Sequence, residues 1–388
     1  MSGDGRRGMV WALVLLLAGG VAYAQDAPAP ETPSESSEPA AGGDRRGTWQ
    51  LDVEDWIAQP AGVGFIPAVR MSGDPLYDEA LEVEHGTSDG LRYRLGYSLN
   101  SGAGELLFTY WSHADDQPWG QLNAGNYNLY ATMVAPTYAG VNNDGLSDGV
   151  TAQADTSTRD VRLDFARRAF DGPRMRGRWF VGLRWVDHDR VQSAQYLALV
   201  SPLPPVLPPL PYKPELDPTP DSGAMTSRFS GRGVEAGFEL QFPIVKRFQV
   251  DAGMAFAVLR GLTDVRYAST THAYAIVDGD TVVRILEPPY SEFEQLDESG
   301  SPLINTIQQI AFTEGVNSQS LSTDASVLET WIGARWNAWR GLDVFAGFRN
   351  TRYADAGMEV RRVDGFDFED ERVSVDYEGY FLGVGYRY

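Results

Sequence analysis

The chain contains four histidines, and two of them have acidic neighbours in the sequence. His113 is followed closely by two aspartates, and His188 is flanked by an aspartate on each side, whereas His85 and His272 are the other two. A histidine polarised by a carboxylate is the usual general base that activates water or a serine in hydrolases. One hypothesis is therefore an enzyme, either a protease or a lipid acylhydrolase, that uses His113 or His188; the alternative is that these are solvated loop histidines.

A second set of charged residues recurs at alternate positions of short apolar segments. The positions that face the same way carry both signs in nearly equal number: Arg92, Arg94, Glu105, Arg162, Asp164, Arg184, Glu235, Glu239, Asp251, Arg335, Asp343, Arg349 and Arg387. If the segments close into a barrel, this set lines its lumen. There the side chains either form ion pairs that fill a narrow interior or line water and bias the passage of ions.

Other kinds of site are not indicated. The sequence has no cysteine, which excludes disulfides and thiolate metal sites. It has no glycine-rich phosphate loop, zinc-ligand spacing or nucleophile elbow in a suitable context, so we predict no cofactor and no metal. The formal net charge of -21 makes nucleic acid an unexpected partner.

Strands with a period of two must position these residues. The clearest alternation runs from Phe248 to Val258, with apolar residues on one face and small or polar residues on the other. Comparable segments are 91–99, 106–110, 161–165, 179–185, 234–242, 332–338, 342–348 and 380–388, and a first strand lies near 49–57. We predict an all-β fold, a transmembrane antiparallel up-and-down β-barrel of about ten strands, with about eight or twelve as alternatives.

The connections between these segments alternate in length. Short turns are predicted around 100–104, 169–174, 243–246 and 340–341, and long loops at 59–89, 114–156, 191–227, 262–326 and 354–370. Short periplasmic turns and long extracellular loops are typical of outer-membrane barrels. A soluble calycin-like barrel is the structural alternative, but it would not normally place Trp and Phe on its outer face.

The N-terminal region predicts export. Residues 1–24 contain two arginines, an apolar run and then Ala22-Tyr23-Ala24, the order of a signal peptide that is cleaved near Ala24. A membrane anchor is disfavoured because the apolar run is shorter than the ~20 residues that span a bilayer. Residues 25–47, rich in Pro, Ser and Glu, predict a disordered periplasmic tether, and 48–388 form the barrel.

The C-terminus has a pattern of its own. Apolar and aromatic residues alternate up to the last position, at Tyr380, Leu382, Val384, Tyr386 and Tyr388. Such an ending resembles the signal that barrel-assembly machinery recognises in outer-membrane proteins. We therefore expect that machinery and outer-membrane lipid as partners.

Three segments carry a family resemblance: 178–185, reading Arg-Trp-Phe-Val-Gly-Leu-Arg-Trp, 227–237, reading Ser-Arg-Phe-Ser-Gly-Arg-Gly-Val-Glu-Ala-Gly, and 248–261. Together they resemble the pore-forming outer membrane proteins typified by the Legionella major outer membrane protein, over residues 160–388. The resemblance implies a porin-like diffusion pore for small solutes or ions in a Gram-negative outer membrane. The expected function is such a passive pore or a structural surface barrel, and a rim enzyme is the alternative.

Overall fold

The computed structural model describes residues 47–388, except 62–64, 72–78, 84, 100–102, 117–119, 124–127, 132, 134–145, 199–220, 279–280, 286–306, 340 and 364–366. Over these ranges the chain forms strands and their connections, and none of it is a helix long and apolar enough to cross a membrane. The predicted signal peptide, nearly all of the tether and the proline-rich stretch 200–220 lie outside the described residues.

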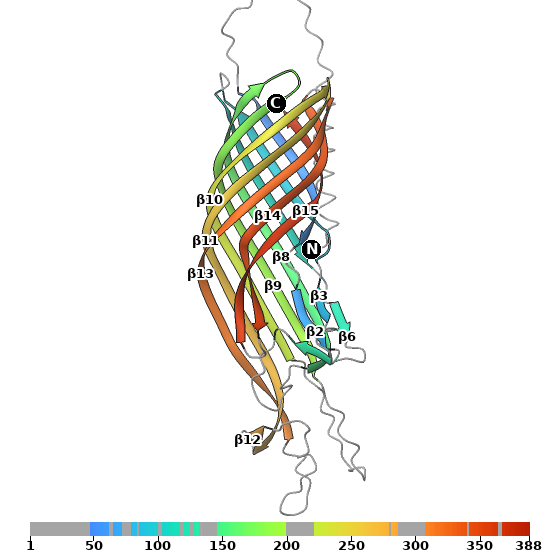
Figure 1. The fold of residues 1–388 in the computed structure, drawn as a ribbon, viewed down its shortest axis with the longest axis vertical. Coiled ribbons are helices and arrows are strands. Elements are labelled where there is room, and N and C mark those ends of the chain that lie inside the picture. The colour runs from blue at the N-terminus through green and yellow to red at the C-terminus, as the bar shows by residue number, and fades with distance from the viewer. Residues whose placement is uncertain are drawn as a thin grey trace, which may run out of the picture.

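Ten long strands form one closed antiparallel ring (Figure 1). Each pairs with its neighbour along the chain, and β1 pairs with β15 from Gln50↔Arg387 to Ala61↔Asp376 to close the ring. The ten are β1 (Trp49–Ala61), β4 (Ser88–Ser98), β5 (Glu105–Asp116), β8 (Leu146–Asp171), β9 (Arg176–Ala198), β10 (Asp221–Val245), β11 (Phe248–Asp278), β13 (Ile307–Trp339), β14 (Leu342–Val363) and β15 (Asp367–Arg387). The prediction of a ten-stranded all-β barrel is confirmed.

Both ends of the barrel chain meet at the end with the short turns. The backbones of Trp49 and Tyr388 exchange two hydrogen bonds, at 3.0 and 2.9 Å. Gly341, in the turn before β14, has φ of 80°, a left-handed conformation that glycine adopts at low cost. We call this the short-turn end, and the opposite one the long-connection end.

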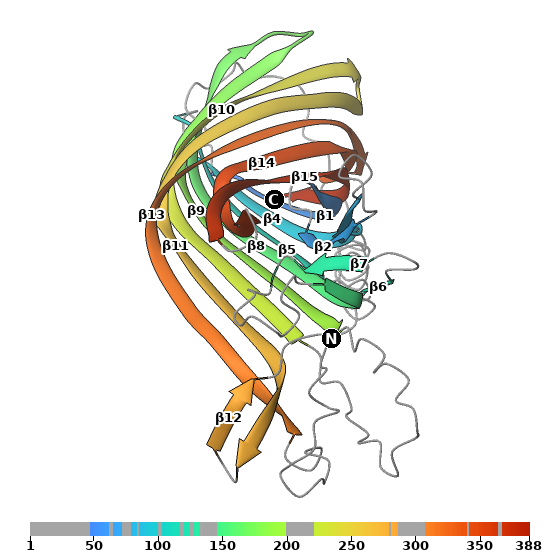
Figure 2. The same ribbon diagram turned by 60° about the horizontal axis from the view of Figure 1, so that its bottom comes forward.

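Five short strands lie at the long-connection end: β2 (Phe65–Met71), β3 (Glu79–Val83), β6 (Gly120–Asn123), β7 (Asn128–Ala131) and β12 (Thr281–Ile285). β6 and β7 pair with β8, β2 pairs with β3 and β7, and β12 pairs with β11. Figure 2 shows β12 at the tips of β11 and β13, and β2, β6 and β7 on the opposite side of the ring. The connections therefore carry further strands that pair with the long ones or with each other.

The strands are longer than the alternation predicted. β11 continues to Asp278 and β13 begins at Ile307, so much of the predicted loop 262–326 is strand. The predicted loops 59–89, 114–156, 191–227 and 354–370 also contain strand. The reason is that backbone pairing continues where neighbouring strands continue, while the outward residues become polar and the dyad pattern of hydrophobicity is lost.

The outer face carries an apolar band. On β10 and β11 the exposed residues include Val234, Phe256 and Val258, which are at least half accessible. Large exposed aromatic residues accompany the band, among them Trp179, Trp185, Trp336, Trp339 and Tyr380. An apolar outer face with aromatic residues is what a barrel wall needs in a bilayer.

Candidate functional site

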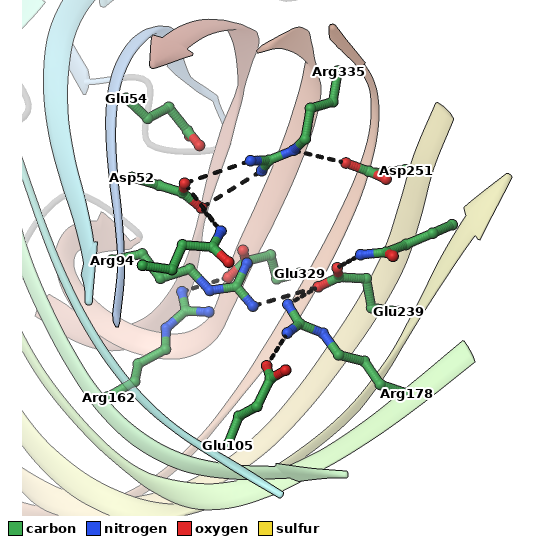
Figure 3. A network of polar contacts seen from close by, with 12 residues as sticks. Asp52, Glu54, Arg94, Glu105, Arg162, Arg178, Glu239, Asp251, Glu329 and Arg335 are labelled. Atoms are coloured by element: carbon green, nitrogen blue, oxygen red, sulfur yellow. Dashed lines mark hydrogen bonds and ion pairs between the residues drawn. The ribbon is translucent and has the colours of Figure 1, made fainter. Parts of the chain in front are cut away.

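The lumen is the part of the molecule in which polar chemistry is concentrated. All thirteen charged residues that the sequence placed inward lie on the inner face or, for Arg387, at the rim of the short-turn end. Figure 3 shows how side chains from opposite walls meet. We divide the lumen into four layers, beginning at the short-turn end: an ion-pair layer, an aromatic layer, a histidine layer and an apolar closure.

The centre of the ion-pair layer is a fully buried group on β8, β9, β10 and β13. Arg184 donates to both oxygens of Asp160 and, at 2.5 Å, to Glu235. Arg162 contacts Asp160 at 3.1 Å and also pairs with Glu329. The side chains of Asp160, Arg184 and Glu329 have no exposed surface. Charges this deeply buried are tolerable only because each has partners of the opposite sign.

Closer to the short-turn end, Arg335 is the hub of a second group. Its guanidinium lies 3.5 Å from Asp52 and 3.2 Å from Asp251 (Figure 3). It also lies 3.4 Å from Asp343, so it joins four strands. The ring of Phe345 lies against it, with 4.5 Å between the guanidinium carbon and the ring centroid. This group ties the first strand to the last third of the chain.

Further pairs complete the layer. Arg178 bridges Glu105 and Glu239, each at 2.7 Å, and Arg94 approaches Glu239 at 3.5 Å. The remaining contacts are Arg92 with Glu329 at 3.0 Å, Arg349 with Glu54 at 3.1 Å and Arg387 with Asp343 at 3.4 Å. The cavity left at the centre of the layer is about 70 Å³, and a second cavity of about 220 Å³ lies at its short-turn end, beside Glu105, Arg178 and Arg387. The central cavity holds a few water molecules and no larger solute.

Five members of the layer were missed by the sequence analysis: Asp52, Glu54, Asp160, Arg178 and Glu329. Three of them lie just outside the segments in which the alternation was followed. Asp160 precedes Arg162 by two positions, and Arg178 and Glu329 are in step with inward residues of β9 and β13. Extending each alternation by one or two periods would have found them.

The aromatic layer covers the ion pairs. Trp56, Trp111, Tyr353 and Tyr377 are all buried, and their ring centroids lie 5.0 to 6.3 Å apart. The hydroxyl of Tyr353 donates to Asp160 at 2.8 Å, whereas that of Tyr377 lies 2.6 Å from the hydroxyl of Thr158. The layer therefore contacts the ion pairs on one side and the histidines on the other.

Three histidines form the next layer, and all are buried. His85 Nδ1 lies 2.9 Å from a carboxylate oxygen of Asp115, His113 Nε2 lies 2.8 Å from Ser88 Oγ, and His188 Nδ1 lies 2.8 Å from Thr158 Oγ1. The imidazole in direct contact with a carboxylate is thus that of His85 rather than His113 or His188. The side chain of His272 lies outside the described part.

The electrostatics of this layer favour neutral imidazoles. The outward neighbours of His188 are Asp187 and Asp189, so the layer lies beyond the apolar band. Burial lowers the pKa of His113 to about 4 and that of His188 to about 3, and Arg190 contributes to the second shift. The second ring nitrogen of each of the three histidines has no hydrogen-bond partner among the described residues. Within that same part of the chain no group of three or more ligands is arranged to hold a metal.

The apolar closure fills the long-connection end. Phe65, Leu81 and Met133, from the predicted loops 59–89 and 114–156, pack against inward residues of the wall such as Met225 and Tyr196. The Tyr196 hydroxyl donates to the carbonyl of Pro67 at 2.7 Å and accepts from the Met133 amide at 3.2 Å. The two connections are therefore held inside the wall by hydrogen bonds as well as by apolar contacts.

Comparisons with solved structures find outer-membrane barrels. The outer membrane protease OmpT from Escherichia coli is 8% identical, with 90% of this chain and 99% of that one covered and a TM-score of 0.44. A FadL homologue of Pseudomonas aeruginosa is 10% identical over 89% and 90% of the two chains, with a TM-score of 0.25. The P. putida toluene transporter TodX is 9% identical over 89% and 90%, with a TM-score of 0.24.

No curated protein sequence matches this chain. The family model of the Legionella pneumophila major outer membrane protein precursor does match, over residues 61–388. That range contains nine of the ten wall strands whole, and all of the described lumen layers draw on it. The chain belongs to the Legionella outer membrane protein family, and it is a β-barrel of the Gram-negative outer membrane.

Proposed function

We propose that the protein is a structural barrel of the cell surface whose lumen is closed to solutes. The observation that carries this proposal is the ion-pair layer, whose centre leaves a cavity of only about 70 Å³. The apolar closure is a second barrier in series with it, at the end that faces the exterior in outer-membrane barrels. A solute would have to displace both.

The energetic cost of separating buried ion pairs supports a lumen that stays closed. Opening the ion-pair layer would separate Arg184 from Asp160 and Glu235, all three of which are fully buried. Separating a buried charge from its partner costs about 3–5 kcal/mol. Several such contacts would have to break together to pass even a small sugar, so spontaneous opening is rare.

The test is conductance in planar bilayers. The refolded mature protein is inserted at known density, and a general diffusion porin serves as the positive control in the same membrane. We expect no discrete current steps, and no swelling of liposomes that contain the protein in isotonic sugar. Regular steps from the wild-type protein would overturn the proposal and favour a passive diffusion pore.

A second candidate function rests on the contact between His85 and Asp115. A buried histidine held at 2.9 Å by a carboxylate, with its other nitrogen free of hydrogen bonds among the described residues, has the arrangement of a general base. The histidine is 4% exposed, which places this hydrolase second to the closed barrel.

The hydrolase is tested with peptide and lipid substrates. If the protein is a hydrolase of this kind, the wild type hydrolyses one of these substrates, and the activity is lost in His85→Ala and in Asp115→Asn. Asp187→Asn is the matched control, because Asp187 is exposed on the outer face and bonds Ser230 rather than a histidine. Activity that survives in His85→Ala would exclude this role.

A further inference from the structure

An unusual pair of arginines lies on the outer face of β10 and β11. Val234 and Val258 are register partners and are 61% and 52% exposed, as residues of the apolar band. The next outward pair towards the exterior is Arg232 opposite Arg260. Both side chains are exposed, that of Arg260 by 83%.

The position of this pair corresponds to the lipid headgroups. The uninterrupted run of outward apolar residues on β11 extends from Phe248 to Val258, a rise of about 25 Å for a strand tilted by about 40°, which matches the height of the lipid-facing band of such barrels. Beyond Arg260 a single exposed leucine, Leu262, precedes the polar outward residues. Trp185, the register partner of Arg232 on β9, is 39% exposed, and outward tryptophans mark the membrane interface. The guanidinium groups therefore lie at the outer boundary of the hydrocarbon.

The protein compensates the two charges unequally. Like charges directly opposite on neighbouring strands repel each other. Arg260 has Asp324 of β13 as its register partner on the other side and makes an exposed ion pair with it at 4.0 Å, whereas the described residues place no carboxylate within ion-pair distance of Arg232. By contrast Arg228, four positions along the same face of β10, makes two bonds to Asp189 at 2.7 and 3.2 Å.

We propose that Arg232 and Arg260 bind the phosphate of a phosphorylated glycolipid in the outer leaflet. A phosphate between the two guanidiniums replaces the repulsion with charge-assisted, bidentate hydrogen bonds. The acyl chains of the same lipid lie against Val234 and Val258, and Trp185 flanks the headgroup. The site is on the outside of the wall, so it is independent of whether the lumen conducts.

The test is binding of lipid A by the full mature protein in neutral detergent, measured by native mass spectrometry. We expect Arg232→Gln combined with Arg260→Gln to weaken binding of diphosphorylated lipid A by about tenfold or more, the effect of losing charge-assisted hydrogen bonds. Arg228→Gln is the matched control, because its partner is Asp189, and it should change binding by less than about twofold.

Two further ligands make the test decisive. Dephosphorylated lipid A should bind wild type as weakly as lipid A binds the double variant, and inorganic phosphate at the same concentration should not compete. Equal binding of both lipids, unchanged binding by the double variant, or competition by inorganic phosphate would each overturn the proposal. Heat-modified mobility on gels checks that the variant is folded, and Arg232→Gln alone serves as a milder second variant.

Discussion

The ion-pair layer and the histidine layer are buried by the same barrel wall, yet their titratable groups differ in whether they stay charged. In the first, arginines such as Arg184 remain charged, because a guanidinium does not lose its proton, and each is surrounded by carboxylates. In the second, His113 and His188 meet hydroxyl groups and lose their charge instead. The supply of opposite charges, rather than burial itself, decides which groups stay ionised.

The two layers should therefore fail in different ways. The ion-pair layer is sensitive to the loss of a single partner, because each buried charge depends on a few opposite charges. Side-chain substitutions in the histidine layer should cost less stability, but acidification should destabilise this layer because its buried imidazoles are neutral. The predictions below begin with the largest expected effect.

Removing one partner in the ion-pair layer should be the most damaging change. Arg184→Ala leaves Asp160 and Glu235 buried without their main partner, and we expect it to lower the free energy of unfolding by about 3–5 kcal/mol. Urea unfolding in detergent micelles measures this. Arg228→Ala, which removes an exposed pair with Asp189, should cost less than about 1 kcal/mol. Equal losses in the two variants would mean that the buried network is not a stability determinant.

Acidification should destabilise the histidine layer. The pKa of His113 is about 4 and that of His188 about 3 in the folded protein, both below the ordinary value of a histidine. Below the unfolded pKa the unfolded chain binds protons that the folded chain does not, so stability is complete above about pH 6.5 and falls as pH drops towards 4. We expect a loss of about 2 kcal/mol for each of the two histidines between about pH 7 and pH 5, or about 4 kcal/mol together.

The control for this pH effect is the variant His113→Gln with His188→Gln. Other carboxylates of the chain titrate equally in both proteins, so the difference between the two stability profiles isolates the histidines. Parallel profiles of wild type and variant over that range would show that the imidazoles bind protons equally readily in the folded and the unfolded chain, which contradicts the lowered pKa values.

The two buried tyrosines offer a finer comparison, because each contacts a different layer. Tyr353→Phe removes a hydrogen bond of 2.8 Å to the charged Asp160, and Tyr377→Phe removes one of 2.6 Å to the neutral Thr158. We expect losses of about 1.5–3 kcal/mol for the first and about 0.5–1.5 kcal/mol for the second. Urea unfolding measures which variant loses more stability. A larger loss for Tyr377→Phe would contradict the account in which only the ion-pair layer carries charged groups.

Much of this architecture was predictable from the sequence because a barrel wall imposes a period of two. The alternation indicated all ten strands, and it placed Arg184 and Glu235 on one face although they are far apart in the chain. It gave no information beyond the apolar band, where outward residues become polar and the pattern disappears. Asp160 and Glu329 were missed at this boundary.

The histidine layer and the apolar closure were not predictable for a different reason. The contact between His85 and Asp115 joins residues beside two connections, and the position of Met133 in the mouth depends on how another connection folds back. No periodic constraint acts on such segments, so their side-chain contacts follow from tertiary packing alone. The acidic neighbours of His188 in the sequence pointed to a carboxylate contact, yet Asp187 faces outward and bonds Ser230.

The closed lumen is tested most directly by thiol accessibility, because the chain has no cysteine of its own. Ala257 is fully buried in the lumen, whereas Gln241 borders a cavity of about 220 Å³ at the short-turn end. With a charged, water-soluble thiol reagent, Gln241→Cys should react rapidly in the folded protein, and Ala257→Cys should react only after unfolding. Rapid modification of Ala257→Cys in the native barrel would show that water and solutes pass through the layers, and the account of a closed barrel would be wrong.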